Sequence, residues 1–245
     1  MRKGLHGWTI RHVLIRMLLM VSTAAISHAQ TPQAAGSDST PELSGVWVGK
    51  PAGQVSFSKE QLPMQRRAEH DYRYNTIDAH NPSSAGRKQL DPHIVHCAPP
   101  GVPRLWLFDG PFEIIQKPEQ IVIFYEEDHN FRQVWMNVSE HPKDFGHSWV
   151  GHSIGKWDGN TLVIDTVGLR KEPWLDNAGH VNSDELHLVE RLNRIDQTHL
   201  KIDITFDDPK AFTRSWTGQR FAELVPNGEI RENVTCGDRI MKEIP

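Results

Sequence analysis

Apolar and polar residues alternate along short segments from residue 111 onward. The clearest segment is residues 200–206, Leu-Lys-Ile-Asp-Ile-Thr-Phe, in which every second residue is apolar. Because successive side chains of a β-strand point to opposite faces of the sheet, this pattern predicts strands with one buried face. Strands are expected at residues 43–49, 112–116, 121–126, 131–136, 150–157, 161–167, 186–194, 199–206, 211–216, 220–224 and 229–234.

The segments between these strands are short and rich in turn residues. Residues 158–160, Asp-Gly-Asn, are the strongest hairpin signal, because Asp-Gly favours the tight turns that join antiparallel strands. The strands do not alternate with helices, so we expect an all-β, mainly antiparallel fold, either a barrel or a sandwich. One short helix is expected over residues 58–74, with Ser58 as N-cap and Gln61 at the capping-box position. Residues 75–104 predict a long irregular loop.

The first 29 residues have the features of a secretory signal peptide. They carry four basic residues and no acidic residue, an apolar stretch at 17–26, and the small-x-small sequence Ser27-His28-Ala29. We therefore expect cleavage after Ala29 and a location in the periplasm or outside the cell. Residues 30–42 are polar and small and predict a flexible linker, so the β-domain is expected to span residues 43–245.

Charge and cysteine content restrict the partners. The whole chain has a formal net charge of −4, and removal of the four basic residues in 1–29 changes it to −8. An acidic chain without basic clusters is unsuited to nucleic acid or anionic lipid, and no apolar run reaches the roughly 18 residues that a transmembrane helix needs. Cys97 and Cys236 are the two cysteines. An even count in an exported chain favours a disulfide over a reactive thiol.

Ionisable residues on apolar strand faces are the first candidates for chemistry. His152, Asp165 and Glu190 each share a predicted face with apolar neighbours. Burying a charge is costly unless the charge is paired, so the three are expected to face a common cavity and to partner one another. A histidine paired with a carboxylate suits general acid–base catalysis. Taken singly, each of the three favours a structural role, for example Glu190 paired with an arginine; taken together in one cavity, two carboxylates and a histidine favour a functional role.

A second concentration of polar residues lies at the start of the strand predicted at 186–194. His180 and Asp184 lie in the loop before this strand, and His187 lies on it. Loops at a barrel mouth commonly carry function, although a solvated loop explains the same residues.

The tryptophans provide candidate ligand contacts. Trp149 and Trp174 lie in loops bounded by Gly and Pro, close in sequence to the histidines, and are expected to stack on a planar ligand or to plug the end of a barrel. Trp135 and Arg191 complete the set of substrate-binding candidates.

Metal binding by histidine is a further alternative. His147 and His152 are five residues apart, and His180 and His187 are seven apart. On a strand an odd separation places side chains on opposite faces, and neither spacing is typical of zinc. The segment His93-x-x-His96-Cys97 is nearer to a ligand set, but its cysteine is expected to form the disulfide. No cofactor and no metal is therefore expected in the leading prediction.

Five segments of the domain form a distinctive set. They are 43–47 (LSGVW), 151–166 (GHSIGKWDGNTLVIDT), 174–176 (WLD), 180–191 (HVNSDELHLVER) and 207–211 (DDPKA). Together they resemble a family of exported bacterial proteins that is abundant in soil and environmental bacteria. The resemblance covers most of residues 43–236, implies export and a single lipocalin-like β-barrel, and assigns no catalytic residues. Gly45 to Trp47 is also similar to the first strand of lipocalins.

We therefore expect a monomeric or homodimeric β-barrel that holds a small apolar or aromatic molecule. The leading prediction is an exported, cofactor-independent acid–base enzyme, either a lyase, an isomerase or a hydrolase. His152 or His187 is expected as its acid or base, oriented by Asp165 or Glu190. The first alternative is a lipocalin-type binding or carrier protein without catalysis, and the second is a His-ligated metal protein.

Overall fold

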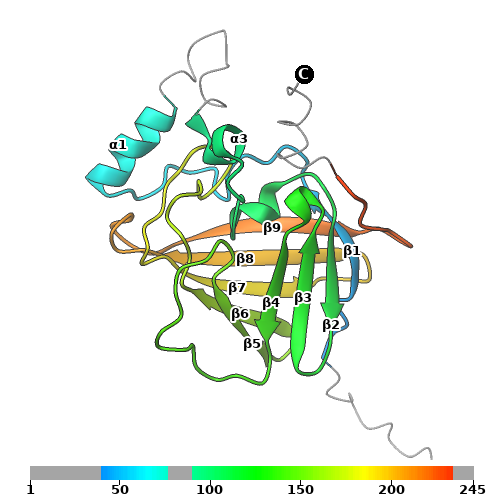
Figure 1. The fold of residues 1–245 in the computed structure, drawn as a ribbon. Coiled ribbons are helices and arrows are strands. Elements are labelled where there is room, and N and C mark those ends of the chain that lie inside the picture. The colour runs from blue at the N-terminus through cyan, green and yellow to red at the C-terminus, as the bar shows by residue number, and fades with distance from the viewer. Residues whose placement is uncertain (1–39, 77–89, 234–245) are drawn as a thin grey trace, which may run out of the picture. The chain divides into compact units, whose positions relative to one another are not determined.

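The computed structural model describes residues 40–76 and 90–233 of the chain. In these residues nine strands form a closed barrel in chain order, and the last strand pairs with the first (Figure 1). The predicted all-β, mainly antiparallel barrel is therefore confirmed. The strands are β1 (Gly45–Lys50), β2 (Phe112–Gln116), β3 (Gln120–Tyr125), β4 (Phe131–Trp135), β5 (His152–Asp158), β6 (Thr161–Val167), β7 (His187–Arg194), β8 (His199–Asp207) and β9 (Trp216–Leu224).

One pair of neighbouring strands is parallel. Strands β4 and β5 pair in parallel through Val134 with Ser153 and Trp135 with Ile154, whereas every other neighbouring pair is antiparallel. A parallel pair needs a connection that returns to the starting end of the first strand. Residues 136–151 form this connection and pass outside the strands (Figure 1).

Side chains fill the interior of the barrel. Alternation along β8 places Leu200, Ile202, Ile204 and Phe206 inside, each with no exposed surface. The 3-10 helix η2 (Arg104–Leu107) is buried throughout and inserts Trp106 among these inner residues. Other fully buried core residues include Trp47, Ile114, Ile123, Val134, Leu162, Ile164, Leu188 and Leu192.

The short N-terminal helix begins later than predicted. Helix α1 spans Arg66–Asn75, and its N-cap is Gln65. Residues 58–65 are not helical because Met64 forms an isolated antiparallel bridge with Phe212. The Ser58 hydroxyl accepts a hydrogen bond from the backbone N–H of Glu60, which is a local turn and not a helix cap.

The segment 75–104 is not wholly irregular. It contains α3 (Pro92–His96), whose N-cap Asp91 accepts a hydrogen bond from the backbone N–H of His93. A further short 3-10 helix, η3 (Glu127–His129), joins β3 to β4.

Two strand predictions near the C-terminus are wrong. The strands expected at 211–216 and 220–224 are replaced by the single strand β9, which begins at Trp216 and runs through Gly218 without a break. A Cβ on Gly218 would lie 2.4 Å from Cβ of Phe57, so this glycine permits a close approach and does not mark a turn. Residues 229–233 form no strand.

Several predictions lie outside the described residues. These are the signal peptide at 1–29, most of the linker at 30–42, and Cys236. Cys97 is not a free thiol, and its pairing with Cys236 stays a prediction. No helix in the described ranges is long and apolar enough to cross a membrane.

Candidate functional site

Asp165 is the centre of a cluster on the outer face of the barrel. It lies on β6 directly opposite Ile154 of β5 on one side and Val189 of β7 on the other. His152 and His187 each lie two residues before these partners, so they are the diagonal neighbours of Asp165, within reach of its carboxylate. Three of the six side chains predicted from the sequence as catalytic candidates are thus brought together.

A fourth residue, His141, completes the cluster from the connection 136–151. Its Nε2 lies 2.9 Å from Oδ1 of Asp165, and Nε2 of His187 lies 2.9 Å from the same oxygen. Nδ1 of His141 lies 2.8 Å from Nδ1 of His152. The outer-wall relay therefore runs from His152 through His141 to Asp165, with His187 bound on the far side.

The proton positions in the relay follow from the chemistry of its members. An ionised carboxylate only accepts hydrogen bonds, so His141 and His187 both donate Nε2–H to Asp165. Neutral His141 then has a lone pair on Nδ1, which accepts Nδ1–H of His152. This leaves the Nε2 lone pair of His152 free to accept a proton. Burial first, and coulombic repulsion by the His141 ring second, lower the pKa of His152 below its ordinary value, which favours this neutral base.

His152 also lines a pocket of about 470 Å³ with aromatic walls. Phe145 of the connection packs edge-on against the His152 ring, with 5.1 Å between ring centroids. The Arg170 guanidinium lies 4.5 Å from the centroid of Trp149, which holds that indole in place. The pocket is lined by His129, Asn130, Phe131, Gln133, Trp135, Phe145, Ser148, Trp149, Val150, Gly151, His152 and Ser153.

Asp165 lines a second pocket, of about 580 Å³, under the same connection. Apolar side chains of the outer face, Ile154, Val163 and Val189, form much of its wall. The relay therefore joins an aromatic pocket at His152 to an apolar pocket at Asp165.

Glu190 does not belong to this cluster, contrary to the expectation of a common cavity. It lies on the inner face of β7, fully buried, because it is three residues from His187 and therefore on the opposite side of the strand. Its carboxylate accepts hydrogen bonds from Arg132 and from Nε1 of Trp106. The interaction is a closed ion pair inside the barrel, separated from Asp165 by the sheet.

Two further candidates lie in the loop between β6 and β7, away from the relay. His180 is buried, and its Nδ1 lies 2.7 Å from Oδ2 of Asp176, while Tyr72 stacks on its ring with 4.1 Å between centroids. Asp184 is bound to Lys210 at the surface, and the hydrogen bond from Lys210, followed by its charge, lowers the pKa of the Asp184 carboxyl. The His180 and Asp184 side chains are therefore separate from one another and from His152.

Of the four residues predicted to contact a ligand, two lie in the aromatic pocket and two do not. Trp135 and Trp149 both line the aromatic pocket. Trp174 is buried, with the Arg104 guanidinium 5.7 Å from its ring, and Arg191 forms an exposed ion pair with Asp158. Trp174 and Arg191 thus have other partners and do not contribute to this pocket.

Sequence reasoning missed His141, Phe145 and Arg132. His141 and Phe145 lie in a connection without periodicity, and no spacing links them to β5 or β6. Arg132 alternates with the outward residues Phe131 and Gln133, so its inward position is readable from the pattern once Val134 is taken as core.

Fold and site together define a single nine-stranded β-barrel with a histidine–carboxylate relay on its outer wall and an aromatic pocket at one end of that relay. Comparison with protein-family models, with curated proteins and with solved structures finds no match.

Proposed function

We propose that the protein is an acid–base enzyme that acts on a small aromatic molecule bound beside His152. The observation that carries the proposal is His152, which lines a pocket with Trp135, Phe145 and Trp149 and is bound through Nδ1 to His141, itself bound to Asp165. A volume of about 470 Å³ lies within the range of small-molecule sites. Export to the periplasm or beyond, inferred from residues 1–29, is part of the same proposal.

The relay supplies both halves of a proton transfer. Nε2 of His152 takes a proton from the substrate, while the bond from its Nδ1–H to His141, which is bound in turn to Asp165, keeps the ring oriented. The same Nε2–H then returns the proton to the atom on which negative charge has developed. Trp149 and Trp135 position the flat substrate over this nitrogen.

A generic probe of proton abstraction tests this proposal. In 5-nitrobenzisoxazole a base removes the proton on C3, the electron pair forms a nitrile as the N–O bond breaks, and a coloured nitrophenolate is released. His152→Ala is expected to lower kcat/KM for this probe about 100-fold or more, the contribution typical of a positioned general base. The matched control is His199→Ala, which removes an exposed histidine paired with Asp196 and should leave turnover unchanged.

Binding separates the enzyme from a carrier with the same pocket. Trp149→Ala is expected to raise KM for the probe more than it lowers kcat, whereas Trp157→Ala, outside this pocket, should change neither. The proposal of an enzyme would be wrong if the wild type, His152→Ala and His199→Ala turned the probe over equally. Weaker probe binding by Trp149→Ala in the same experiment would then indicate a binding protein.

A further inference from the structure

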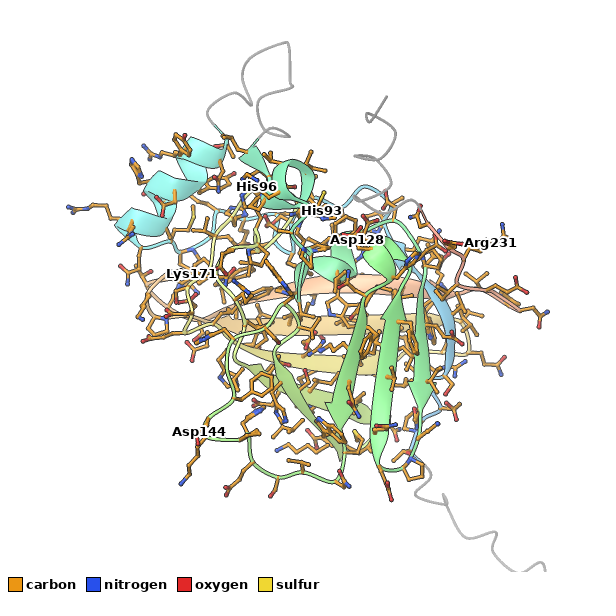
Figure 2. The ribbon with its side chains drawn as sticks, viewed as in Figure 1. His93, His96, Asp128, Asp144, Lys171 and Arg231 are labelled. Atoms are coloured by element: carbon orange, nitrogen blue, oxygen red, sulfur yellow. The ribbon has the colours of Figure 1, made fainter. Side chains whose placement is uncertain are left out.

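A second group of ligand-type side chains lies where α3 meets η3, on different elements from the outer-wall relay. Figure 2 shows His93 of α3 beside Asp128 of η3. Nε2 of His93 is 3.3 Å from Oε1 of Glu127, and Nδ1 is 3.3 Å from Oδ2 of Asp128. One ligand atom from each of the three residues lies within 4.8 Å of the others. We infer that His93, Glu127 and Asp128 bind a divalent metal ion of the zinc type.

The orientation of the His93 ring is the first argument. The ring is 3% exposed, and its Nδ1 lies 3.0 Å from the backbone carbonyl oxygen of Ala98, to which it donates. Metal-binding histidines commonly donate their second nitrogen to a carbonyl in this way. Nε2 then faces the Glu127 carboxylate, and either a proton or a metal ion between them lets the two groups approach this closely.

The state of Asp128 is the second, independent argument. Its Oδ1 is buried and has no hydrogen-bond partner among the described residues, which is costly for a carboxylate oxygen. Its backbone has φ 50° and that of His129 has φ 51°, a left-handed conformation that non-glycine residues seldom adopt. Such strain is common where a structure holds a side chain against a ligand. A bound cation would satisfy Oδ1 and offset the two negative charges.

The ligand set indicates the kind of ion. One imidazole nitrogen with two carboxylates suits Zn²⁺ or Mn²⁺ better than Ca²⁺ or Mg²⁺, which prefer oxygen ligands alone. Three protein ligands leave a position for water on a four-coordinate ion. Because His93 belongs to α3 and both carboxylates to η3, the ion would tie α3 to the connection between β3 and β4.

Zinc titration of the untagged full-length protein tests the inference. After treatment with a chelator, calorimetry is expected to show one Zn²⁺ per chain, and Zn²⁺ should raise the Tm. Glu127→Gln and Asp128→Asn preserve side-chain size and should each weaken Zn²⁺ binding at least about tenfold, the loss seen even for outer partners of metal ligands. The controls are Glu126→Gln, which removes the adjacent carboxylate, and His96→Ala, which removes the exposed histidine of α3; both should bind as the wild type does.

Three outcomes would overturn the inference. If the wild type binds Zn²⁺ no more tightly than the double variant Glu127→Gln, Asp128→Asn, the site holds a proton only. If Glu126→Gln weakens Zn²⁺ binding as much as Glu127→Gln does, the ion is attracted by the general negative charge of the segment and not by a defined site. If His187→Ala loses Zn²⁺ binding and Glu127→Gln retains it, the ion binds at the outer-wall relay instead.

Discussion

His141 determines the chemistry of the outer-wall relay, because among the described residues it is the one bound to both His152 and Asp165. Its Nε2 is bound to the carboxylate, so its Nδ1 accepts from His152, and the proton-accepting nitrogen of His152 is directed away from the relay. His141 thus links the aromatic pocket to the carboxylate, and, after burial, its coulombic repulsion is the second cause that lowers the pKa of His152. Removing it should change the pH at which His152 acts.

We therefore predict the pH profile of turnover of 5-nitrobenzisoxazole. His152 is an active base only when neutral, so kcat/KM should rise with pH through its lowered pKa and level off, with the inflection below 6.5. In His141→Gln one lowering cause is removed, so the inflection should move up toward 6.5 while the plateau falls. The other titratable groups near this pocket are Asp165, His187 and His129, and none is changed in the variant.

Stopped-flow rates between acidic and neutral pH measure both profiles. A wild-type inflection at or above 6.5, or the same inflection in both proteins, would show that His152 and His141 are not coupled in this way. His199→Ala serves as the control, and its profile should match that of the wild type.

The sequence predicted three members of the relay but not the face on which they lie. Alternation places His152 and Asp165 on strand faces with apolar neighbours, and these positions were predictable because side chains on a strand repeat every two residues. Apolar residues normally mark the inner face, but here the connection 136–151 covers Val163 on the outer face as well. With both faces of the strand apolar, no periodicity separates inside from outside.

At the scale of elements, the joint between β4 and β5 is the least paired part of the barrel wall. Only two residue pairs form it, and Gly155 lies beside them on the inner face. A Cβ on Gly155 would lie 2.6 Å from Sδ of Met136 and 2.8 Å from Cγ1 of Val134. The glycine thus allows β5 to approach β4.

Gly155→Ala should overpack this joint and lower the free energy of unfolding by about 1–3 kcal/mol. Gly146→Ala is the matched control, because a Cβ there has no neighbour within 4 Å, and its effect should be within about 0.5 kcal/mol. Urea denaturation followed by tryptophan fluorescence measures both. Equal midpoints for the two variants would mean that the joint adapts without cost.

Local chemistry explains which elements were predictable. The hairpin of β5 and β6 turns at Gly159 and Asn160, within the predicted segment 158–160, and it was predictable because turn residues act over a few positions. Strand β9 does not show a continuous apolar face, because its inward positions include Gly218 and the charged Arg220. The start of α1 was misplaced because the bridge between Met64 and Phe212 is a long-range contact that no local pattern encodes.

At the scale of the whole molecule, one ion pair spans the interior from β4 to β7. Arg132 and Glu190 are both fully buried, and Arg132 also donates to the hydroxyls of Ser153 and Thr166. Removing one partner of a buried pair leaves an uncompensated charge, whereas replacing both by apolar residues is often neutral.

Glu190→Gln should therefore lower the free energy of unfolding by about 3–5 kcal/mol, and the double variant Arg132→Met, Glu190→Leu should recover most of this loss. Chemical denaturation measures the stabilities. Turnover of 5-nitrobenzisoxazole per folded molecule should be unchanged in Glu190→Gln, since the sheet separates it from His152. A single variant as stable as the wild type would show that the pair carries little stability, and lost turnover in a stable variant would restore Glu190 as a catalytic candidate.

The parallel joint follows from the parity of the barrel. In a closed barrel with an even number of strands, every neighbouring pair can be antiparallel. In a closed barrel of nine strands, at least one neighbouring pair must be parallel. At that pair the chain has to travel back along the outside before it can continue, and here it carries His141 and Phe145 over the wall as it does so. The odd strand count thus creates a covered outer surface whose residues can vary without disturbing the core, and the relay lies there.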